Sequence, residues 1–138
     1  MKMNFEIRDA TKDDMNDVLS LIKELARFEK EPDAVEISVE DLVDHGFSSD
    51  PLFICHVAVH ENKTVGMSLG YKRYSTWKGP TMHLEDLIVS KKYRKKGIGK
   101  ALLSNFIKVA NSLGAKRIEW AVLNWNTDAI SFYEFNGA

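Results

Sequence analysis

Hydrophobic and polar positions alternate along the chain with two different periods. Apolar side chains recur every three to four residues over 15–26 and again over 98–113, which predicts two amphipathic helices. Residues 53–60 and 64–71 are instead rich in β-branched and aromatic side chains and flank a short polar turn, which predicts a β-hairpin. The same criteria predict further strands at 4–9, 81–89 and 117–123 and further helices at 38–46 and 127–136.

Capping residues support several of these boundaries. Thr11 and Asp14 resemble a capping box before the first helix, and Ser38 is expected to cap the second. Gly46 and Gly114 follow helical patterns and are expected to end them, because glycine readily adopts the left-handed conformation found after helix C-termini.

The predicted order of elements is β-α-α-β-β-β-α-β-α, which is typical of a three-layer α/β fold with helices on both faces of a sheet. Residues 74–80 are expected to form an irregular link between two of the strands. Because no repeat or linker divides the sequence, residues 1–138 are expected to form a single domain. The sequence ends directly after a predicted helix, and we expect that a last strand is missing there.

Composition narrows the possible classes of protein. The 19 Lys and Arg residues against 20 Asp and Glu give a net charge of −1, which argues against a polycation that coats nucleic acid. Cys55 is the single cysteine, so an internal disulfide and a cysteine-based zinc site are excluded. The four histidines lack the spacing of metal ligands, and we expect no metal. Without a signal peptide or an apolar membrane segment, a cytoplasmic chain with no membrane partner is expected.

The most informative segment is a basic loop between a predicted strand and a predicted helix. Five Lys and Arg residues occur within 91–96, and Gly97 and Gly99 then open the helix. Glycine lets a ligand approach the backbone, and a helix N-terminus offers unpaired N–H groups and the positive end of the helix dipole. This combination predicts a binding site for a pyrophosphate, with a merely solvated basic loop as the alternative.

Two common phosphate-binding motifs do not fit this loop. A Walker loop requires Ser or Thr where Ala101 stands, and a dinucleotide-binding fingerprint requires a third glycine where Leu102 stands. The remaining pattern is Arg-x-x-Gly-x-Gly, formed by Arg94, Gly97 and Gly99.

Residues 84–103, LEDLIVSKKYRKKGIGKALL, resemble the acetyl-CoA signature of the GNAT acyltransferases. Residues 122–133, VLNWNTDAISFY, resemble the late strand, crossover and helix of the same family. Other segments, such as LIKELARFE at 21–29, resemble the diamine acetyltransferases, which include the spermidine/spermine and thialysine N-acetyltransferases. The resemblance implies the three-layer GNAT fold, with a mixed and mostly antiparallel sheet, acetyl-CoA as cosubstrate, and a homodimer.

The resemblance also implies which residues would bind acetyl-CoA. The pantetheine arm is expected to pair with the backbone of 87–89, where that strand separates from its neighbour, and the pyrophosphate is expected in the basic loop. Each of these residues also has an interpretation without a ligand. The side chains at 87–89 would be core residues, each lysine would be a solvated charge, and Asn126 would cap a turn. The complete set is Leu87, Ile88, Val89, Arg94, Lys95, Lys96, Gly97, Ile98, Gly99, Lys100, Asn126, Thr127, Asp128 and Ala129.

Two residues are candidates for the chemistry. Tyr133 matches the family's acid position, and a phenol can protonate the thiolate that leaves when an amine attacks a thioester. The alternative is that Tyr133 is an ordinary aromatic residue on a helix face beside Phe132 and Phe135. Glu85 and Asp86 are adjacent in an apolar strand and are expected to point to opposite faces of the sheet. Glu85 would bind the cationic amine or pass on its proton, with Asp86 nearby, while structural salt bridges are the alternative for both.

Three further residues complete the expected substrate site. Glu29 matches a polyamine-contact position of the family, and Phe28 and Trp77 would line the channel by cation–π contact. Lys30 and Pro32 interrupt the acidic stretch after Glu29, which weakens the polyamine interpretation specifically.

The sequence therefore predicts an enzyme that transfers an acetyl group from acetyl-CoA to a primary amine of a small cationic substrate, by direct attack in a ternary complex. A polyamine or diamine is the first expectation, and a thialysine-like amino acid is the second. The alternatives are a CoA-binding regulatory domain without turnover and a family member that acetylates a protein lysine or N-terminus. A nucleic-acid module using residues 91–100 is disfavoured, because Tyr93 is the single stacking aromatic there.

Overall fold

The structure is a computed structural model, and it describes residues 3–120. In that part of the chain the strands are β1 (Glu6–Asp9), β2 (Ile54–His60), β3 (Lys63–Ser75), β4 (Gly79–Val89) and β5 (Arg117–Trp120). The helices are α1 (Met15–Phe28), α2 (Val39–Gly46) and α3 (Ile98–Ser112), with two short 3-10 turns, η1 (Lys12–Asp14) and η2 (Lys91–Tyr93). The predicted strand end at 121–123 and the predicted helix at 127–136 lie outside the described residues.

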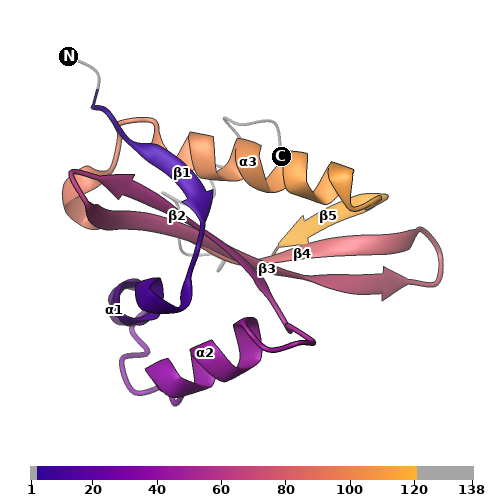
Figure 1. Cartoon of the computed structure of the whole chain (residues 1–138), viewed down its shortest axis with the longest axis horizontal. Coiled ribbons are helices and arrows are strands. Elements are labelled where there is room, and N and C mark those ends of the chain that lie inside the picture. Colours follow the sequence, from indigo (N-terminus) through magenta and orange to yellow (C-terminus); the bar gives the residue numbers. More distant parts are fainter. Residues whose placement is uncertain (1–2, 121–138) are drawn as a thin grey trace.

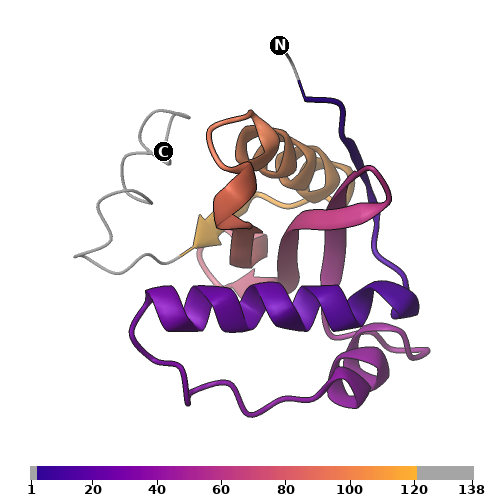
Figure 2. The same cartoon turned by 90° about the vertical axis from the view of Figure 1, so that its left-hand side faces the viewer.

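The strands form one sheet in the order β1-β2-β3-β4-β5. Neighbours from β1 to β4 are antiparallel, and β5 is parallel to β4. Helices α1 and α2 cover one face and α3 covers the other (Figure 1), and the turned view in Figure 2 shows the sheet between α1 and α3. The predicted three-layer α/β fold with a mixed, mostly antiparallel sheet is therefore confirmed.

Both expected N-terminal caps form. The Thr11 amide donates to Asp14 Oδ2 at 2.7 Å, and Arg8 donates two hydrogen bonds to the same carboxylate at 2.8 and 3.0 Å. These hydrogen bonds from Arg8 hold the pKa of Asp14 below its usual value although the residue is buried. At α2, Ser38 Oγ accepts from the Asp41 amide at 3.1 Å, and the Ser38 amide donates to the Asp41 carboxylate at 2.9 Å.

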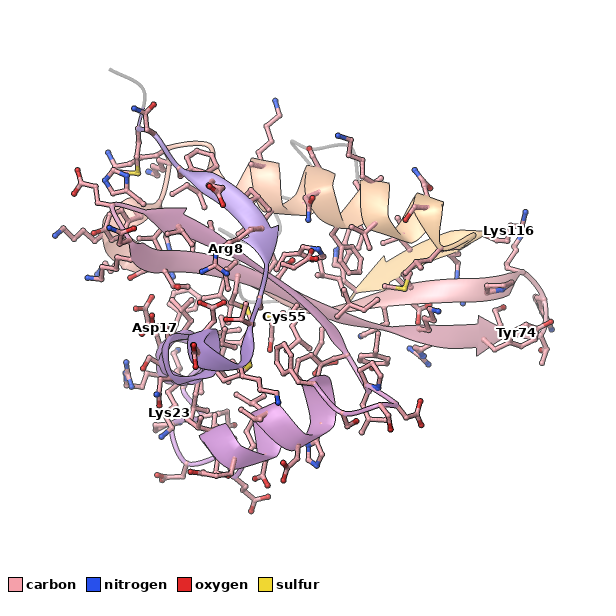
Figure 3. All side chains as sticks on the ribbon, viewed as in Figure 1. Arg8, Asp17, Lys23, Cys55, Tyr74 and Lys116 are labelled. Carbon is pink, nitrogen blue, oxygen red and sulfur yellow. The ribbon has the colours of Figure 1, made fainter. Side chains whose placement is uncertain are left out.

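The prediction of an irregular link over residues 74–80 is wrong. β3 continues to Ser75 and β4 begins at Gly79, with Tyr74 paired to Pro80. The outer half of this hairpin is solvent-exposed and carries few apolar side chains, so the hydrophobic pattern gave no sign of the extra strand residues. Figure 3 shows Tyr74 at the far end of the hairpin, away from Cys55 in the body of the molecule.

A row of small residues on β3 lets α3 pack closely against the sheet. A Cβ atom at Gly70 would lie 2.5 Å from the ring of Phe106 and 2.6 Å from the carbonyl oxygen of His83. A Cβ atom at Gly66 would lie 3.2 Å from Leu102. Because α3 rests directly on the strands, its N-terminus is held beside the end of β4.

The core lies in two layers, one on each face of the sheet. Between the sheet and the first two helices, the buried side chains include Met15, Val18, Leu21, Leu42, Val57, Met67 and Ile88. Between the sheet and α3, they include Met82, Leu84, Ile98, Leu102, Leu103 and Phe106.

Candidate active site

β4 contains a β-bulge at the two acidic residues. Leu69 of β3 pairs with Asp86, but its neighbour Gly70 pairs with Leu84, so Glu85 is an extra residue without a partner in this register. A bulge of this kind interrupts the alternation of side chains along a strand.

The bulge places both carboxylates on the same face of the sheet. Asp86 lies opposite Leu69, which packs in the core layer beneath α1. Glu85 contacts Tyr71, which lies two residues beyond Leu69 on β3 and therefore on the same face. The prediction that Glu85 and Asp86 point to opposite faces is therefore wrong, because the extra residue shifts the alternation by one position.

Asp86 lies in an unusual electrostatic environment. Burial, followed by the negative charges of Glu85 and Glu29, raises the pKa of Asp86 to about 6. Burial also raises the pKa of Glu29, which caps the C-terminus of α1. The charges of Glu85 and Glu29 thus both act on Asp86, and a cation placed beside Asp86 would be stabilised.

Cys55 faces the same layer and is chemically inert. Its side chain is buried, and burial, followed by the charges of Asp14 and Asp86, raises the pKa of its thiol to about 12. Because the thiolate is the nucleophilic form of cysteine, this environment supports the interpretation of Cys55 as a core residue.

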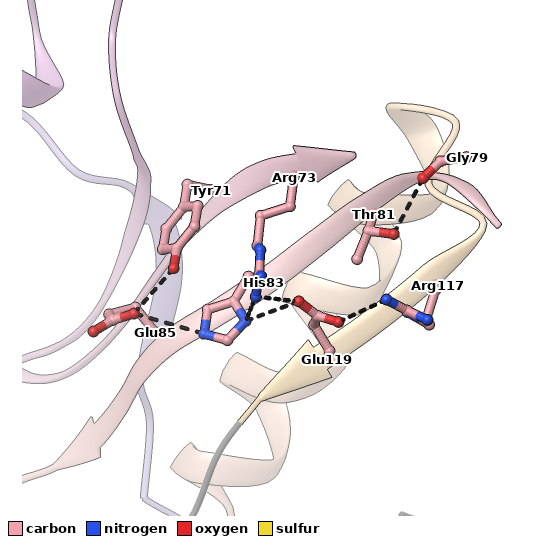
Figure 4. Close-up of polar contacts among 8 residues, drawn as sticks. All are labelled: Tyr71, Arg73, Gly79, Thr81, His83, Glu85, Arg117 and Glu119. Carbon is pink, nitrogen blue, oxygen red and sulfur yellow. Dashed lines mark hydrogen bonds and ion pairs between the residues drawn. The ribbon is translucent and has the colours of Figure 1, made fainter. Parts of the chain in front are cut away.

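Glu85 itself is accessible and belongs to a polar network (Figure 4). Its side chain is 53% exposed, and its Oε1 accepts a hydrogen bond from the Tyr71 hydroxyl at 3.4 Å. His83 Nε2 lies 3.6 Å from the same oxygen, and the network continues to Glu119 of β5. An exposed carboxylate beside a buried one can exchange protons with solvent or substrate.

The basic loop has the backbone conformation that a phosphate site requires. Lys95 and Gly97 have left-handed backbone, with φ of 62° and 86°. The Ala101 amide donates to the Gly97 carbonyl at 3.1 Å, so the amides of residues 98–100 precede the first helical hydrogen bond and have no acceptor within the helix. A Cβ atom at Gly97 would meet nothing within 4 Å, which leaves open space over the backbone for a ligand.

The side chains of this loop are exposed, and Arg94 is the one that braces it. Lys91, Lys92, Lys95, Lys96 and Lys100 are exposed to solvent. Arg94 Nε donates to the carbonyl oxygen of Val89 at 3.0 Å, and its guanidinium lies 5.7 Å over the ring of Phe28.

Glu24 of α1 is a second brace, which the sequence analysis missed. It accepts hydrogen bonds from Ser90 Oγ at 3.3 Å and from the Lys91 amide at 3.1 Å, and it lies 3.9 Å from the Arg94 guanidinium. The sequence offered one signal for this role: Glu24 lies three residues after Leu21, which is buried, so an acidic side chain shares the inward face of α1.

The second half of β4 lies next to the loop. The pairing of β4 with the described part of β5 runs from Thr81 to Leu84 and does not include residues 85–89. The side chains of Leu87, Ile88 and Val89 pack in the two core layers, which leaves their backbone as the part that a ligand can reach.

The other expected site residues are not all brought together. Phe28 and Glu29 lie at the end of α1, whereas Trp77 is 92% exposed at the tip of the β3–β4 hairpin (Figure 1). Asn126, Thr127, Asp128, Ala129 and Tyr133 lie outside the described residues.

Residues 3–120 contain neither a metal-binding cluster nor a membrane-spanning helix. No three His, Cys, Asp or Glu side chains of this part of the chain are placed to hold a metal ion. Its helices are too short or too polar to cross a membrane.

Solved structures share this fold. An aminoglycoside acetyltransferase from an uncultured soil metagenomic sample matches with a TM-score of 0.80 and 20% identity, over 97% of this chain and 88% of that one. An integron cassette protein from the mobile metagenome of V. cholerae matches with a TM-score of 0.79 and 28% identity, over 99% and 86%. These matches show the fold that this chain shares with the two proteins.

The chain belongs to the acetyltransferase (GNAT) family, whose model matches residues 15–138. It is 39% identical to the thialysine N-epsilon-acetyltransferase of Mus musculus over 96% of this chain and 82% of that protein. It is 36% identical to a spermidine/spermine N(1)-acetyltransferase-like protein of Homo sapiens over 97% of this chain and 20% of that protein. The chain is thus an acetyl-CoA-dependent N-acetyltransferase.

Proposed function

We propose that this enzyme acetylates a primary amine of a small aliphatic cation, either a polyamine or diamine or a thialysine-like amino acid. The observation that carries the proposal is the cluster of Glu29, Glu85 and Asp86 on one face of the sheet. Burial is the larger cause of the raised pKa of Asp86, and the negative charges of Glu85 and Glu29 add to it. A positively charged ligand beside these carboxylates would be stabilised by them and would relieve the part that is due to repulsion. The names of the similar proteins agree with this substrate class.

Acetyl-CoA supplies the thioester that the amine attacks. The amides at the start of α3 and the left-handed backbone at Gly97 fit a pyrophosphate, and the exposed lysines of the loop add positive charge around it. The backbone of β4 at residues 87–89, which lies beyond the described pairing with β5, fits the amide-bearing pantetheine arm, and Arg94 with Glu24 holds the loop in place. The proposal includes Asn126, Thr127, Asp128 and Ala129 as further contacts.

Glu85 and Tyr133 perform the proton transfers in this proposal. An ammonium group must lose a proton before its nitrogen can attack, and the accessible Glu85 carboxylate accepts it directly or through one water. Tyr133 donates a proton to the departing thiolate, as a phenol with an ordinary pKa near 10 can. No acyl-enzyme is needed, which agrees with the inert state of Cys55.

A thiol-release assay with acetyl-CoA tests the substrate class. The panel contains spermidine, putrescine, thialysine, lysine and a lysine-containing peptide, with ethanolamine, which carries a single amino group, as the comparison of lowest charge. We expect turnover with at least one of the small cations and little with the peptide. Turnover with the peptide alone would overturn the proposal in favour of protein acetylation, and acetyl-CoA binding without any turnover would favour a regulatory domain.

A homodimer is part of the same proposal. The exposed aromatic side chains of Tyr74 and Trp77 on the β3–β4 hairpin, 75% and 92% exposed, support it because large exposed aromatic residues are enriched at interfaces. Light scattering of the wild type and of Trp77→Ser tests this part, and a monomeric wild type would contradict it.

A further inference from the structure

His83 lies between two carboxylates that belong to different strands (Figure 4). Its Nε2 lies 3.6 Å from Glu85 Oε1, and its Nδ1 lies 3.3 Å from Glu119 Oε1. The His83 side chain is 15% exposed, and its ring stacks at 5.1 Å on Tyr71, with an interplanar angle of 36°. The imidazole is therefore fixed in the sheet, with one nitrogen directed to each carboxylate.

Glu119 is held as an anion at the far side of the ring. Burial opposes ionisation, but the hydrogen bond from His83 and the charges of Arg73 and Arg117 together hold the pKa of Glu119 below its usual value. Arg117 donates to Glu119 Oε2 at 3.0 Å, and Arg73 donates to its Oε1. The carboxylate is thus fixed from two sides and accepts a hydrogen bond from Nδ1 when Nδ1 carries the proton.

This arrangement determines what the other nitrogen can do. A neutral imidazole carries one N–H and one lone pair, so a proton on Nδ1, directed at Glu119, leaves the lone pair of Nε2 facing Glu85. Arg73 Nη1 also lies 3.3 Å from Nδ1 and favours the opposite tautomer, with Nε2–H directed at Glu85. Both neutral tautomers of His83 therefore have a partner: Glu119 favours the proton on Nδ1, and Arg73 favours the proton on Nε2. The charged and titratable groups recorded against it in the described chain are Tyr71 and Arg73 of β3, Glu85 of β4 and Glu119 of β5.

We propose that His83 is a positioning residue that orients Glu85 and removes from it the proton that leaves the substrate amine. The inference rests on the proposed function, in which Glu85 accepts that proton. The 3.6 Å separation is bridged by a small rotation of the half-exposed Glu85 side chain or by one water, since such contacts are often long without substrate.

The proton balance of this path is complete. An N–H bond of the ammonium group breaks and an O–H bond forms on Glu85, and the same proton then forms a bond to Nε2 of His83. The anionic Glu119 stays beside Nδ1 and stabilises the imidazolium, and the proton then leaves from Nε2 to solvent on the side of the exposed Glu85. One proton leaves the substrate and one reaches solvent, and the two carboxylates and the neutral ring are restored.

The test compares His83→Gln and His83→Phe with the wild-type enzyme, using the small amine that the thiol-release panel identifies. Glutamine keeps a polar side chain but cannot accept and release a proton. Phenylalanine keeps an aromatic ring against Tyr71 but has no titratable group. We expect kcat/KM for the amine to fall about tenfold near pH 7 in both variants, with the KM for acetyl-CoA unchanged. The matched control is His45→Gln, an exposed histidine of α2, which should retain full activity.

The pH dependence separates a relay from a structural role. Aliphatic amines have a pKa of about 10.4, so raising the pH supplies free amine that needs no base. The deficit of both variants should therefore shrink several-fold between about pH 7 and about pH 9.5. A deficit of equal size at every pH, or none at all, would overturn the relay and leave the proposed function intact. A wild type that releases no thiol with any amine would instead overturn the proposed function, and the relay with it.

Discussion

The basic loop and the acidic bulge are neighbours along the chain but are built in opposite ways. In the loop, the lysines of residues 91–100 are exposed, and the binding groups are backbone amides set by local sequence. At the bulge, Asp86 is largely buried and its pKa is raised, and the site exists because β3 and β4 pair with a shifted register. The comparison indicates that a site made of backbone amides can form from local sequence while its side chains stay in solvent. A site made of acidic side chains forms only where the tertiary structure brings the like charges together.

The largest effect is expected at the accessible member of the acidic pair. Glu85→Gln keeps the shape of the side chain but removes both the charge and the proton acceptor. We expect kcat/KM for the amine to fall about 100-fold, within the usual range for general-base catalysis, while the dissociation constant of acetyl-CoA stays within about twofold. Steady-state kinetics and calorimetry measure the two quantities, with Glu40→Gln on the exposed face of α2 as control. Intact amine kinetics would make Glu85 structural.

The buried member of the pair should reveal itself in stability rather than in rate. The pKa of Asp86 is about 6 in the folded state and about 4 in an unfolded chain, so the folded state binds more protons between these values. The free energy of unfolding should therefore decrease as the pH rises from about 4 to about 6, by on the order of 2–3 kcal/mol. Asp86→Asn should remove most of this decrease, leaving the part due to Glu29, whose pKa is also raised.

Urea denaturation at several pH values measures that effect. Asp44→Asn, which changes an exposed carboxylate of α2, serves as control and should retain the wild-type pH dependence. If the free energy of unfolding of Asp86→Asn and of the wild type depends on pH in the same way, the pKa of Asp86 is not raised by its surroundings.

The loop offers a matched pair of glycines for the next test. Gly97 and Gly114 both have left-handed backbone, with φ of 86° and 79°, and a Cβ atom at either would meet nothing within 4 Å. Valine at either position should therefore cost similar stability. Gly97→Val should in addition weaken acetyl-CoA binding about tenfold, or about 1.4 kcal/mol, because a side chain would cover the backbone amides. Calorimetry showing equal affinity for both variants would remove the loop from the cofactor site.

The smallest effect is expected from the brace on α1. Glu24→Gln keeps a hydrogen-bond acceptor for Ser90 and Lys91 but removes the charge near Arg94. Because the ion pair is partly exposed, we expect only about a threefold loss of acetyl-CoA affinity. This loss should decrease at high salt, while Glu36→Gln, an exposed acid in the loop before α2, should cause none.

The difference between a site set by local sequence and a site set by strand pairing also explains how well each region could be predicted. The loop could be predicted, because a strand, a basic stretch, Gly97 and a helix follow one another directly. The fold could be predicted because hydrophobic periodicity and caps such as Ser38 are local signals. Each predicted helix and strand within residues 3–120 is present, and the main error was the length of the exposed β3–β4 hairpin.

The acidic site could be predicted only in part. Glu85 and Asp86 were identified as unusual, but their common face depends on the pairing of Gly70 with Leu84, which no local pattern reveals. The contact of His83 with Glu119 joins residues 36 positions apart and depends on β5 lying beside β4. Such contacts require the three-dimensional fold.

The central claim is that the acidic bulge recognises the amine and the basic loop recognises acetyl-CoA. The most direct test is a matrix of initial rates, with both substrates varied, for the wild type, Glu85→Gln and Gly97→Val. The account predicts that Glu85→Gln raises the KM of the amine and not that of acetyl-CoA, and that Gly97→Val does the reverse. An equal rise of both constants in either variant would contradict it, because the two regions would then not bind separate substrates.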